Sequence, residues 1–258
     1  MFSTALARVI RRGARSVPGI ELPERAVHVW LLPDGLVHDA CDGLAHTLSD
    51  DEVQRAVRYR RQRDRERFIA RRGVLRVLLG GYHSRDPSSL RFTTSGTGKP
   101  ALALTGAHPV RFSVSQTDGL AAIACARSHE PGIDVERSVS SGDTLRIGGE
   151  VLTAVERDSL CAHGHTTGAS LLRTWTRKEA LLKAVGTGLS GASGAWSVLA
   201  DTHTGQAYWR ALYRGTELRG WTLTDVKVPD AFIAALAIPC QDVAISVIDW
   251  EDTSVASK

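Results

Sequence analysis

The sequence predicts an α+β protein made of two similar lobes. Each half of the 258-residue chain reads as a strand, then helices, then a set of strands. Apolar residues at helical spacing fill the middle of each half, and period-two alternation marks the segments around them. The two halves are similar in the order of their strands and helices, and no sequence repeat relates them. We expect the boundary near residues 126–132.

In the first half a strand is expected at residues 27–32, where apolar side chains alternate. Ser49 and Glu52 have the spacing of a capping box, in which each side chain satisfies a free amide at the start of a helix. A long helical region follows, and we expect it to end at Gly80-Gly81. Further strands of this half are expected at residues 110–114 and 120–126.

The second half opens with a strand at residues 133–135. A helical block is expected over residues 149–184, with a break at the glycines of residues 164–168. Three strands follow, at residues 221–228, 231–237 and 244–247. The expected organisation is an N-terminal extension (1–26), an N-terminal lobe (27–128), a C-terminal lobe (129–250) and a tail (251–258).

Composition excludes several classes of protein. The sequence has no uninterrupted apolar run near the roughly 20 residues that cross a bilayer, so we expect no membrane partner. Its four cysteines are scattered without a C-x-x-C pair, which is typical of reduced thiols in the cytoplasm. The net charge of +4 favours encounter with an acidic partner but does not indicate a nucleic-acid binder.

Two carboxylates stand at Asp134 and Glu136, within the expected strand Gly132-Ile133-Asp134-Val135-Glu136. Residues two apart on a strand share a face, so Ile133 and Val135 should turn into the core. Neighbouring carboxylates repel each other unless a cation lies between them, and Mg²⁺ binds one or two carboxylates together with phosphate and water. Alone, the pair also fits an exposed strand with two solvated acids.

A helical segment over residues 171–184 carries a further acid. Trp175, Glu179 and Lys183 follow at i, i+4 and i+8 and therefore lie along one face. Glu179 and Lys183 alone would also fit an ordinary surface ion pair. Gly186 and Gly188 then end the helix and allow close approach to a ligand.

Together, GIDVE and the later WTRKEALLKAVGTGL resemble the 4'-phosphopantetheinyl transferases, specifically the broad-specificity, two-lobed Sfp-like group. The resemblance covers residues 27–250 and is strongest over 96–189. It implies that Asp134 binds Mg²⁺, with Mn²⁺ as an alternative, and that Glu136 holds the ion directly or through water. It implies that Glu179 is a third metal ligand and catalytic base, and that Lys183 contacts the coenzyme A phosphate and assists the leaving group.

The resemblance also implies a set of coenzyme A contacts. Lys99 and Pro100 match the family's G-K-P element, whose lysine touches the nucleotide phosphates. Ser115 matches the family's F-N-x-S-H-S/T segment, but Gln116 replaces its histidine, which contacts the 3'-phosphate. Glutamine never carries a positive charge, and a neutral hydrogen bond is about half as strong as a charge-assisted one. We therefore expect a weaker phosphate contact at Gln116.

An arginine-rich helix spans residues 55–76. By the same resemblance, Arg67 grips the 3'-phosphate and Arg55 lies near the nucleotide. The remaining arginines fit a solvated face or an attraction for an acidic carrier protein.

The implied function is transfer of the 4'-phosphopantetheine arm of coenzyme A to a serine of an acyl or peptidyl carrier protein, with release of 3',5'-ADP. The enzyme would be a holo-[acyl-carrier-protein] synthase type transferase, monomeric and cytoplasmic, with carrier proteins that present an acidic recognition helix. Activation of polyketide, nonribosomal-peptide or siderophore synthases follows from the group resembled. Two alternatives stay open: an altered-donor or inactive relative, suggested by Gln116, and an arginine-rich nucleic-acid-binding protein, which would lose affinity steeply with salt.

Overall fold

The computed structural model describes residues 19–35, 41–94, 96, 98–103, 109–138, 152–162, 164, 167–187, 193–200 and 209–250. Most of the expected N-terminal extension and all of the expected tail lie outside these residues.

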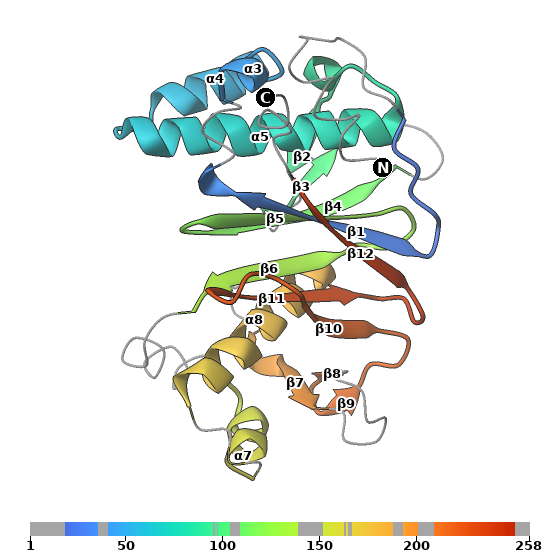
Figure 1. The fold of residues 1–258 in the computed structure, drawn as a ribbon. Coiled ribbons are helices and arrows are strands. Elements are labelled where there is room, and N and C mark those ends of the chain that lie inside the picture. Colours follow the sequence, from blue (N-terminus) through green and yellow to red (C-terminus); the bar gives the residue numbers. More distant parts are fainter. Residues whose placement is uncertain are drawn as a thin grey trace, which may run out of the picture.

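Helices and strands are distributed over two lobes, as expected from the sequence (Figure 1). The helical elements are α3 (Cys41–Ala45), α4 (Asp50–Val57), α5 (Gln62–His83), η1 (Pro87–Ser89), α7 (Ala154–Ala162), α8 (Gly168–Val185) and η2 (Ser193–Ala195). One sheet has the order β12-β1-β5-β4, from Ala244–Asp249, Ala26–Pro33, Leu120–Ala126 and Arg111–Thr117. A second has the order β10-β11-β6, from Thr222–Val226, Phe232–Ile238 and Gly132–Arg137. Two small sheets are β2-β3 (Phe92–Thr94, Pro100–Leu102) and β7-β8-β9 (Trp196–Ala200, Trp209–Tyr213, Thr216–Glu217).

The main elements stack in four layers: α5, the β12-β1-β5-β4 sheet, the β10-β11-β6 sheet and α8 (Figure 1). Three apolar clusters fill the spaces between them. Trp30 and Ile123 belong to the cluster under α5, Ile133 and Val135 to the cluster between the two sheets, and Leu181 to the cluster around α8. Each main sheet is covered on both sides, so apolar side chains extend from both of its faces into the clusters.

The last described strand, β12, returns to the sheet of the first half. It pairs in parallel with β1, from Ala26 opposite Ala244 to Leu31 opposite Asp249. The Trp250 amide then donates to the Leu31 carbonyl at 2.8 Å, and its indole packs edge-on against Trp30. The chain thus closes the first lobe with residues from its far end.

The long helical region of the first half differs from the prediction at two points. It is divided between α4 and α5, and α5 continues past Gly80-Gly81 to His83, with Ser84 in the left-handed conformation as its cap. The glycine at position 80 serves close packing instead of ending the helix. A Cβ there would lie 2.8 Å from the Arg85 carbonyl oxygen and 3.2 Å from Pro87. The small β7-β8-β9 sheet was not expected from the sequence.

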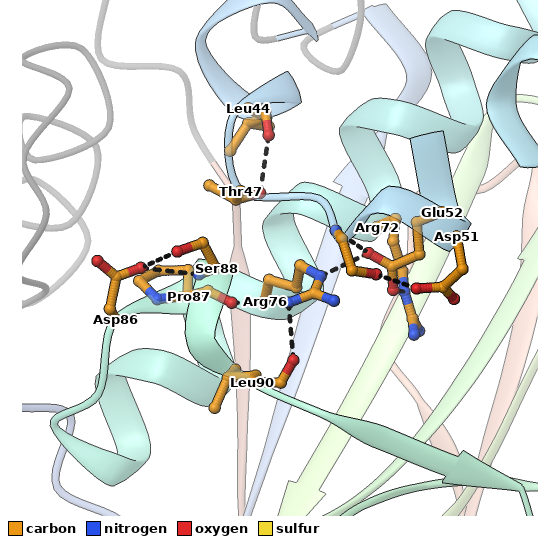
Figure 2. Close-up of polar contacts among 11 residues, drawn as sticks. Leu44, Thr47, Asp51, Glu52, Arg72, Arg76, Asp86, Pro87, Ser88 and Leu90 are labelled. Carbon is orange, nitrogen blue, oxygen red and sulfur yellow. Dashed lines mark hydrogen bonds and ion pairs between the residues drawn. The ribbon is translucent and has the colours of Figure 1, made fainter. Parts of the chain in front are cut away.

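A buried ionic network attaches α4 to α5 and to the turn that follows (Figure 2). The Glu52 carboxylate accepts a hydrogen bond from the Ser49 amide at 3.0 Å, as the capping-box spacing predicts. It also pairs with Arg72 and, at 2.6 Å, with Arg76, whose side chain is only 1% exposed. Arg76 donates further to the carbonyls of Pro87 and Leu90. The network fixes α5 relative to α4 and to the turn at Pro87–Leu90, because it joins all three.

Replacing Glu52 with alanine is expected to lower the free energy of unfolding by about 3 kcal/mol or more, because it leaves the Arg76 cation buried without its counter-ion. Asp51→Ala is the matched control: Asp51 is exposed, and its carboxylate accepts a hydrogen bond from the Ser49 hydroxyl. Its cost should be about 0.5 kcal/mol. Urea denaturation of both variants measures the difference, and equal midpoints would contradict the network's role.

Among the described residues, no helix combines the length and the apolar character needed to cross a membrane.

Candidate active site

The candidate site lies where the edge strand β6 meets helix α8. Gly132 allows this contact, because a Cβ at its position would lie 1.9 Å from the Ala180 carbonyl oxygen and 2.4 Å from the Ala184 amide nitrogen. The helix therefore crosses the strand at backbone distance. Ile133 and Val135 turn to the cluster between the sheets, as expected. Asp134 and Glu136, on the opposite face of the strand, turn toward α8.

Asp134 and Lys183 form the centre of the site. The Lys183 ammonium donates to Asp134 Oδ1 at 2.6 Å and to Ser115 Oγ at 3.1 Å. The Ser115 hydroxyl donates to the same Oδ1 at 2.8 Å. The side chain of Asp134 is 5% exposed and that of Lys183 is 29% exposed. The ammonium thus balances a buried carboxylate while keeping a path to solvent.

Two further carboxylates lie in the field of Asp134. Burial raises the pKa of Glu136 to about 7, with the Asp134 charge acting in the same direction, while Lys183 and a hydrogen bond with Trp175 oppose it. Burial likewise raises the pKa of Glu179 to about 7, and the charges of Asp134 and Glu136 add to this. The sequence-predicted acids are therefore close enough to disfavour one another's ionisation.

Two buried oxygens of these acids lack hydrogen-bond partners: Asp134 Oδ2 and Glu179 Oε1. A buried carboxylate oxygen without a donor is costly, and its usual partner is a proton donor or a cation. In the described part of the chain, no three His, Cys, Asp or Glu side chains converge closely enough to form a metal cluster. The donor set nevertheless fits a hard cation, because all its atoms are carboxylate oxygens and two of them are unsatisfied.

Alternate side chains of β4 hold β6 in register. The hydroxyl oxygens of Ser113, Ser115 and Thr117 accept hydrogen bonds, at 3.2–3.3 Å, from the amides of Ile133, Val135 and Arg137 respectively. In a paired strand, backbone carbonyls would accept from these β6 amides, whereas here side-chain hydroxyls of β4 accept instead. The two lobes therefore join where the edge of β6 meets β4. Ser115, which the family resemblance assigns to a coenzyme A contact, bonds Asp134 in the structure and so helps to set its position.

Helix α8 is fixed by one fully buried ion pair and by a second pair in which only the arginine is buried. Lys178 pairs with Glu156 of α7 at 2.9 Å, and both side chains are fully buried. Glu156 also accepts from the Val198 amide of β7 at 2.9 Å. Arg177 makes a bidentate pair with Asp225, with both N–O distances 2.6 Å. Breaking such a pair leaves a buried charge, so these contacts resist displacement of the helix that carries Glu179 and Lys183.

Lys99 reaches the same helix from the other lobe. Its ammonium donates to the Lys183 carbonyl at 2.9 Å and the Pro131 carbonyl at 3.1 Å, and pairs with Glu130 at 2.9 Å. Pro100 opens β3, where it pairs with Thr94. The structure therefore shows Lys99 tying the end of α8 to the start of β6, and its expected phosphate contact stays a prediction.

A separate cavity of about 340 Å³ lies between α5 and the β4–β5 turn. Both Arg67 and Gln116 line it, so the structure brings these two predicted residues together. Arg55 stands outside, with its guanidinium 5.2 Å from the ring of Phe68, itself a lining residue. Arg71 also lines the cavity and was not singled out from the sequence. Its position one helical turn after Arg67 was the signal that could have identified it.

The sequence of this chain is similar to those of known proteins. A model of the 4'-phosphopantetheinyl transferase superfamily matches residues 130–246, a span that contains β6 and α8. The 4'-phosphopantetheinyl transferase HetI of Nostoc sp. (strain PCC 7120 / SAG 25.82 / UTEX 2576) is 30% identical over 223 residues, which cover 86% of this chain and 91% of that protein.

The chain belongs to the 4'-phosphopantetheinyl transferase superfamily.

A second relative comes from a different organism. A phosphopantetheinyl transferase of Thraustochytrium sp. (strain ATCC 26185 / S-3) is 27% identical over 201 residues, 72% of this chain and 69% of that protein. The α+β fold expected from the sequence is confirmed, and the chain is a transferase of this superfamily.

In this transferase, replacing Glu179 with glutamine should change the pH dependence of stability. A carboxyl whose folded pKa is about 7, above its usual 4.5, stabilises the fold at low pH and loses that contribution as pH rises through 7. In the presence of a chelator, the unfolding temperature of Glu179→Gln minus that of the wild type should therefore increase from pH 5 to pH 8. Glu21→Gln, at an exposed position, is the control. A constant difference for Glu179→Gln would contradict the buried, repelling arrangement.

Proposed function

We propose that this transferase moves the 4'-phosphopantetheine arm of coenzyme A to a serine of an acyl or peptidyl carrier protein, in a reaction that requires Mg²⁺ and releases 3',5'-ADP. The observation that carries the proposal is a group of three acids, Asp134, Glu136 and Glu179, whose charges disfavour one another's ionisation and which include two buried oxygens without a hydrogen-bond partner. Lys183 pairs with Asp134 in this group. The relatives, which are named as phosphopantetheinyl transferases, support the same reaction.

Each of these residues has a separate role in the proposed phosphoryl transfer. The serine oxygen attacks the β-phosphorus of coenzyme A, the bond from that phosphorus to the bridging oxygen breaks, and 3',5'-ADP departs. Mg²⁺, held by Asp134, Glu136 and Glu179, would neutralise charge on the pyrophosphate of the donor. Lys183, partly exposed and close to Asp134, can donate to the departing phosphate. Glu179 can accept the serine proton at its unpartnered oxygen.

Exposed arginines at the junction of α4 and α5 support an acidic acceptor. Their side chains take no part in the ion pairs around Glu52, so they can attract an approaching acidic carrier protein. The residues are Arg58, Arg60, Arg61, Arg63 and Arg65. An acidic recognition helix on the carrier fits this surface, and carriers of polyketide, nonribosomal-peptide or siderophore synthases are the proposed class.

Intact-mass spectrometry tests the proposal. A purified apo carrier protein incubated with the enzyme, coenzyme A and Mg²⁺ should gain the mass of one phosphopantetheine group. The gain should disappear with a chelator and return with added Mg²⁺ or Mn²⁺. Absence of the gain with carriers of all three classes, although the enzyme is folded, would overturn the proposal and favour a relative with an altered donor.

A further inference from the structure

The cavity between α5 and the β4–β5 turn contains two arginines in fixed positions. It is lined by Tyr59, Asp64, Arg67, Phe68, Arg71, Gln116, Thr117 and Asp118. Arg67 and Arg71 are i and i+4 on α5 and so extend from the same face of that helix. Their neighbours Arg72 and Arg76 extend from another face, into the network of Glu52. The helix is thus held by one arginine pair and presents the other to the cavity.

Strand β4 connects this cavity with the site around Asp134. Ser115 turns toward β6 and bonds Asp134, whereas Gln116, the next residue, turns to the opposite face, toward α5. Gln116 therefore lies by the arginines, and Ser115 lies by Asp134. A donor bound across both places would meet these two residues with different parts of its structure.

Arg71 is held by three groups. It donates from one terminal nitrogen to Gln116 Oε1 at 2.8 Å, and from the other to Asp34 Oδ1 at 2.5 Å and the Thr117 carbonyl at 3.4 Å. Its Nε is buried and has no hydrogen-bond partner. The side chain is 13% exposed. This guanidinium is therefore fixed at the cavity and retains donor capacity.

Asp34 sets the spacing of the two arginines. Its Oδ1 accepts from Arg71, while its Oδ2 pairs with Arg67 at 2.6 Å and accepts from the Gly119 amide at 3.0 Å. One carboxylate thus aligns two guanidiniums without neutralising both. Arg67 has a second counter-ion in Asp118, at 2.7 Å, whose side chain is 63% exposed on the turn. An entering phosphate can take the place of this exposed carboxylate at Arg67.

We propose that Arg71, oriented by Gln116, is a phosphate-binding residue of the donor site. It supplies there the positive charge that, in the family this chain resembles, comes from the histidine at the place of Gln116. The inference rests on the proposed function and goes further, because it assigns specificity for the 3'-phosphate to a guanidinium on α5. Gln116 turns its amide oxygen to Arg71 and so directs its N–H groups elsewhere, available to the same anion. Gln116 and Arg71 together would thus take the place of the family's histidine, and the contact with the 3'-phosphate would be kept.

The test is direct binding of two donors that differ only in the 3'-phosphate. Isothermal titration calorimetry, without carrier protein, gives the dissociation constants of coenzyme A and dephospho-coenzyme A. The ratio of the two constants measures discrimination, which a purely structural role of Arg71 would leave unchanged. Arg71→Leu should reduce this ratio at least about tenfold, because a charge-assisted contact to phosphate is lost.

Three further variants complete the experiment. Arg85→Leu removes the same charge from an exposed position just after α5 that lines no part of this cavity, and should leave the ratio within about twofold of wild type. At about pH 6, below the usual pKa of histidine, Gln116→His should restore much of the discrimination lost in Arg71→Leu. In the wild-type background the same substitution should change the ratio by less than about threefold, because Arg71 already supplies the charge.

The outcomes separate this inference from the proposed function. If Arg71→Leu discriminates as the wild type does while the carrier protein is still modified, the role of Arg71 is wrong and the proposed function stands. An equal loss in Arg85→Leu would also overturn the inference, since it would show a general effect of charge. If the wild-type enzyme binds neither donor, the proposed function fails and this inference with it.

Discussion

Replacing Gly132 with alanine is expected to lower the free energy of unfolding by at least about 4 kcal/mol, at the upper end for single substitutions. The added methyl group would lie within 2.4 Å of backbone atoms of α8, and backbone cannot turn aside as a flexible side chain can. Either the helix moves away from β6 or the strand bends. Both responses separate Asp134 on the strand from Glu179 and Lys183 on the helix.

The Gly132→Ala variant should therefore lose stability and activity together. Thermal denaturation should show a decrease of about 10 °C, and the rate of carrier modification should decrease at least about a hundredfold. Gly194→Ala is the matched control, because a Cβ there meets no atom within 4 Å. Its unfolding temperature and rate should stay close to the wild-type values. A stable, active Gly132→Ala variant would show that β6 and α8 do not cross at backbone distance.

Asp134→Asn is expected to reduce carrier modification at least about a thousandfold without lowering the unfolding temperature. Asparagine keeps the volume of the side chain and an oxygen for the Lys183 ammonium, but it removes the charge that a divalent cation needs. The carboxyls of Glu136 and Glu179 also lose the repulsion that raises their pKa values. The chelator-treated variant should therefore be as stable as the wild type, or more so.

The measurement for Asp134→Asn combines single-turnover kinetics with thermal denaturation. Asp158→Asn, an exposed acid on α7, is the control for loss of one negative charge and should keep full activity. Activity within tenfold of wild type in Asp134→Asn would remove Asp134 from the metal site. A large decrease in the unfolding temperature would instead mean that the carboxylate mainly supports the fold through Lys183 and Ser115.

Local patterns predicted much of the fold. The alternation at residues 27–32 and 133–135 and the helical spacing around Trp175 all correspond to elements of the structure. The errors arose where packing, not local preference, decides. The pair Gly80-Gly81 resembles a helix end, yet α5 continues through it because the following turn packs against the bare backbone. The capping box at Ser49 was correct, but nothing local showed that Glu52 would also neutralise two arginines of the next helix.

The candidate site divides in the same way. Its acids could be predicted because carboxylates two apart on a strand share a face, as do residues four apart on a helix. The spacing of Arg71 from Arg67 places it on the same face of α5, but its contacts with Asp34 and Gln116, which come from other elements, could not be predicted from that spacing. The resemblance assigned Lys99 to phosphate, which stays a prediction, but its contacts with the ends of β6 and α8 could not be predicted because they join distant segments of the chain.

By itself, the sequence determined the types of side chain that this protein can use and the local faces on which they lie, since both follow from spacing along one strand or helix. Tertiary structure alone decided which faces meet. It placed β6 against α8 at Gly132, returned β12 to the first sheet, and set Gln116 beside Arg71. These contacts join residues far apart in the chain, and they depend on close packing and on the pairing of buried charges, for which no local pattern exists.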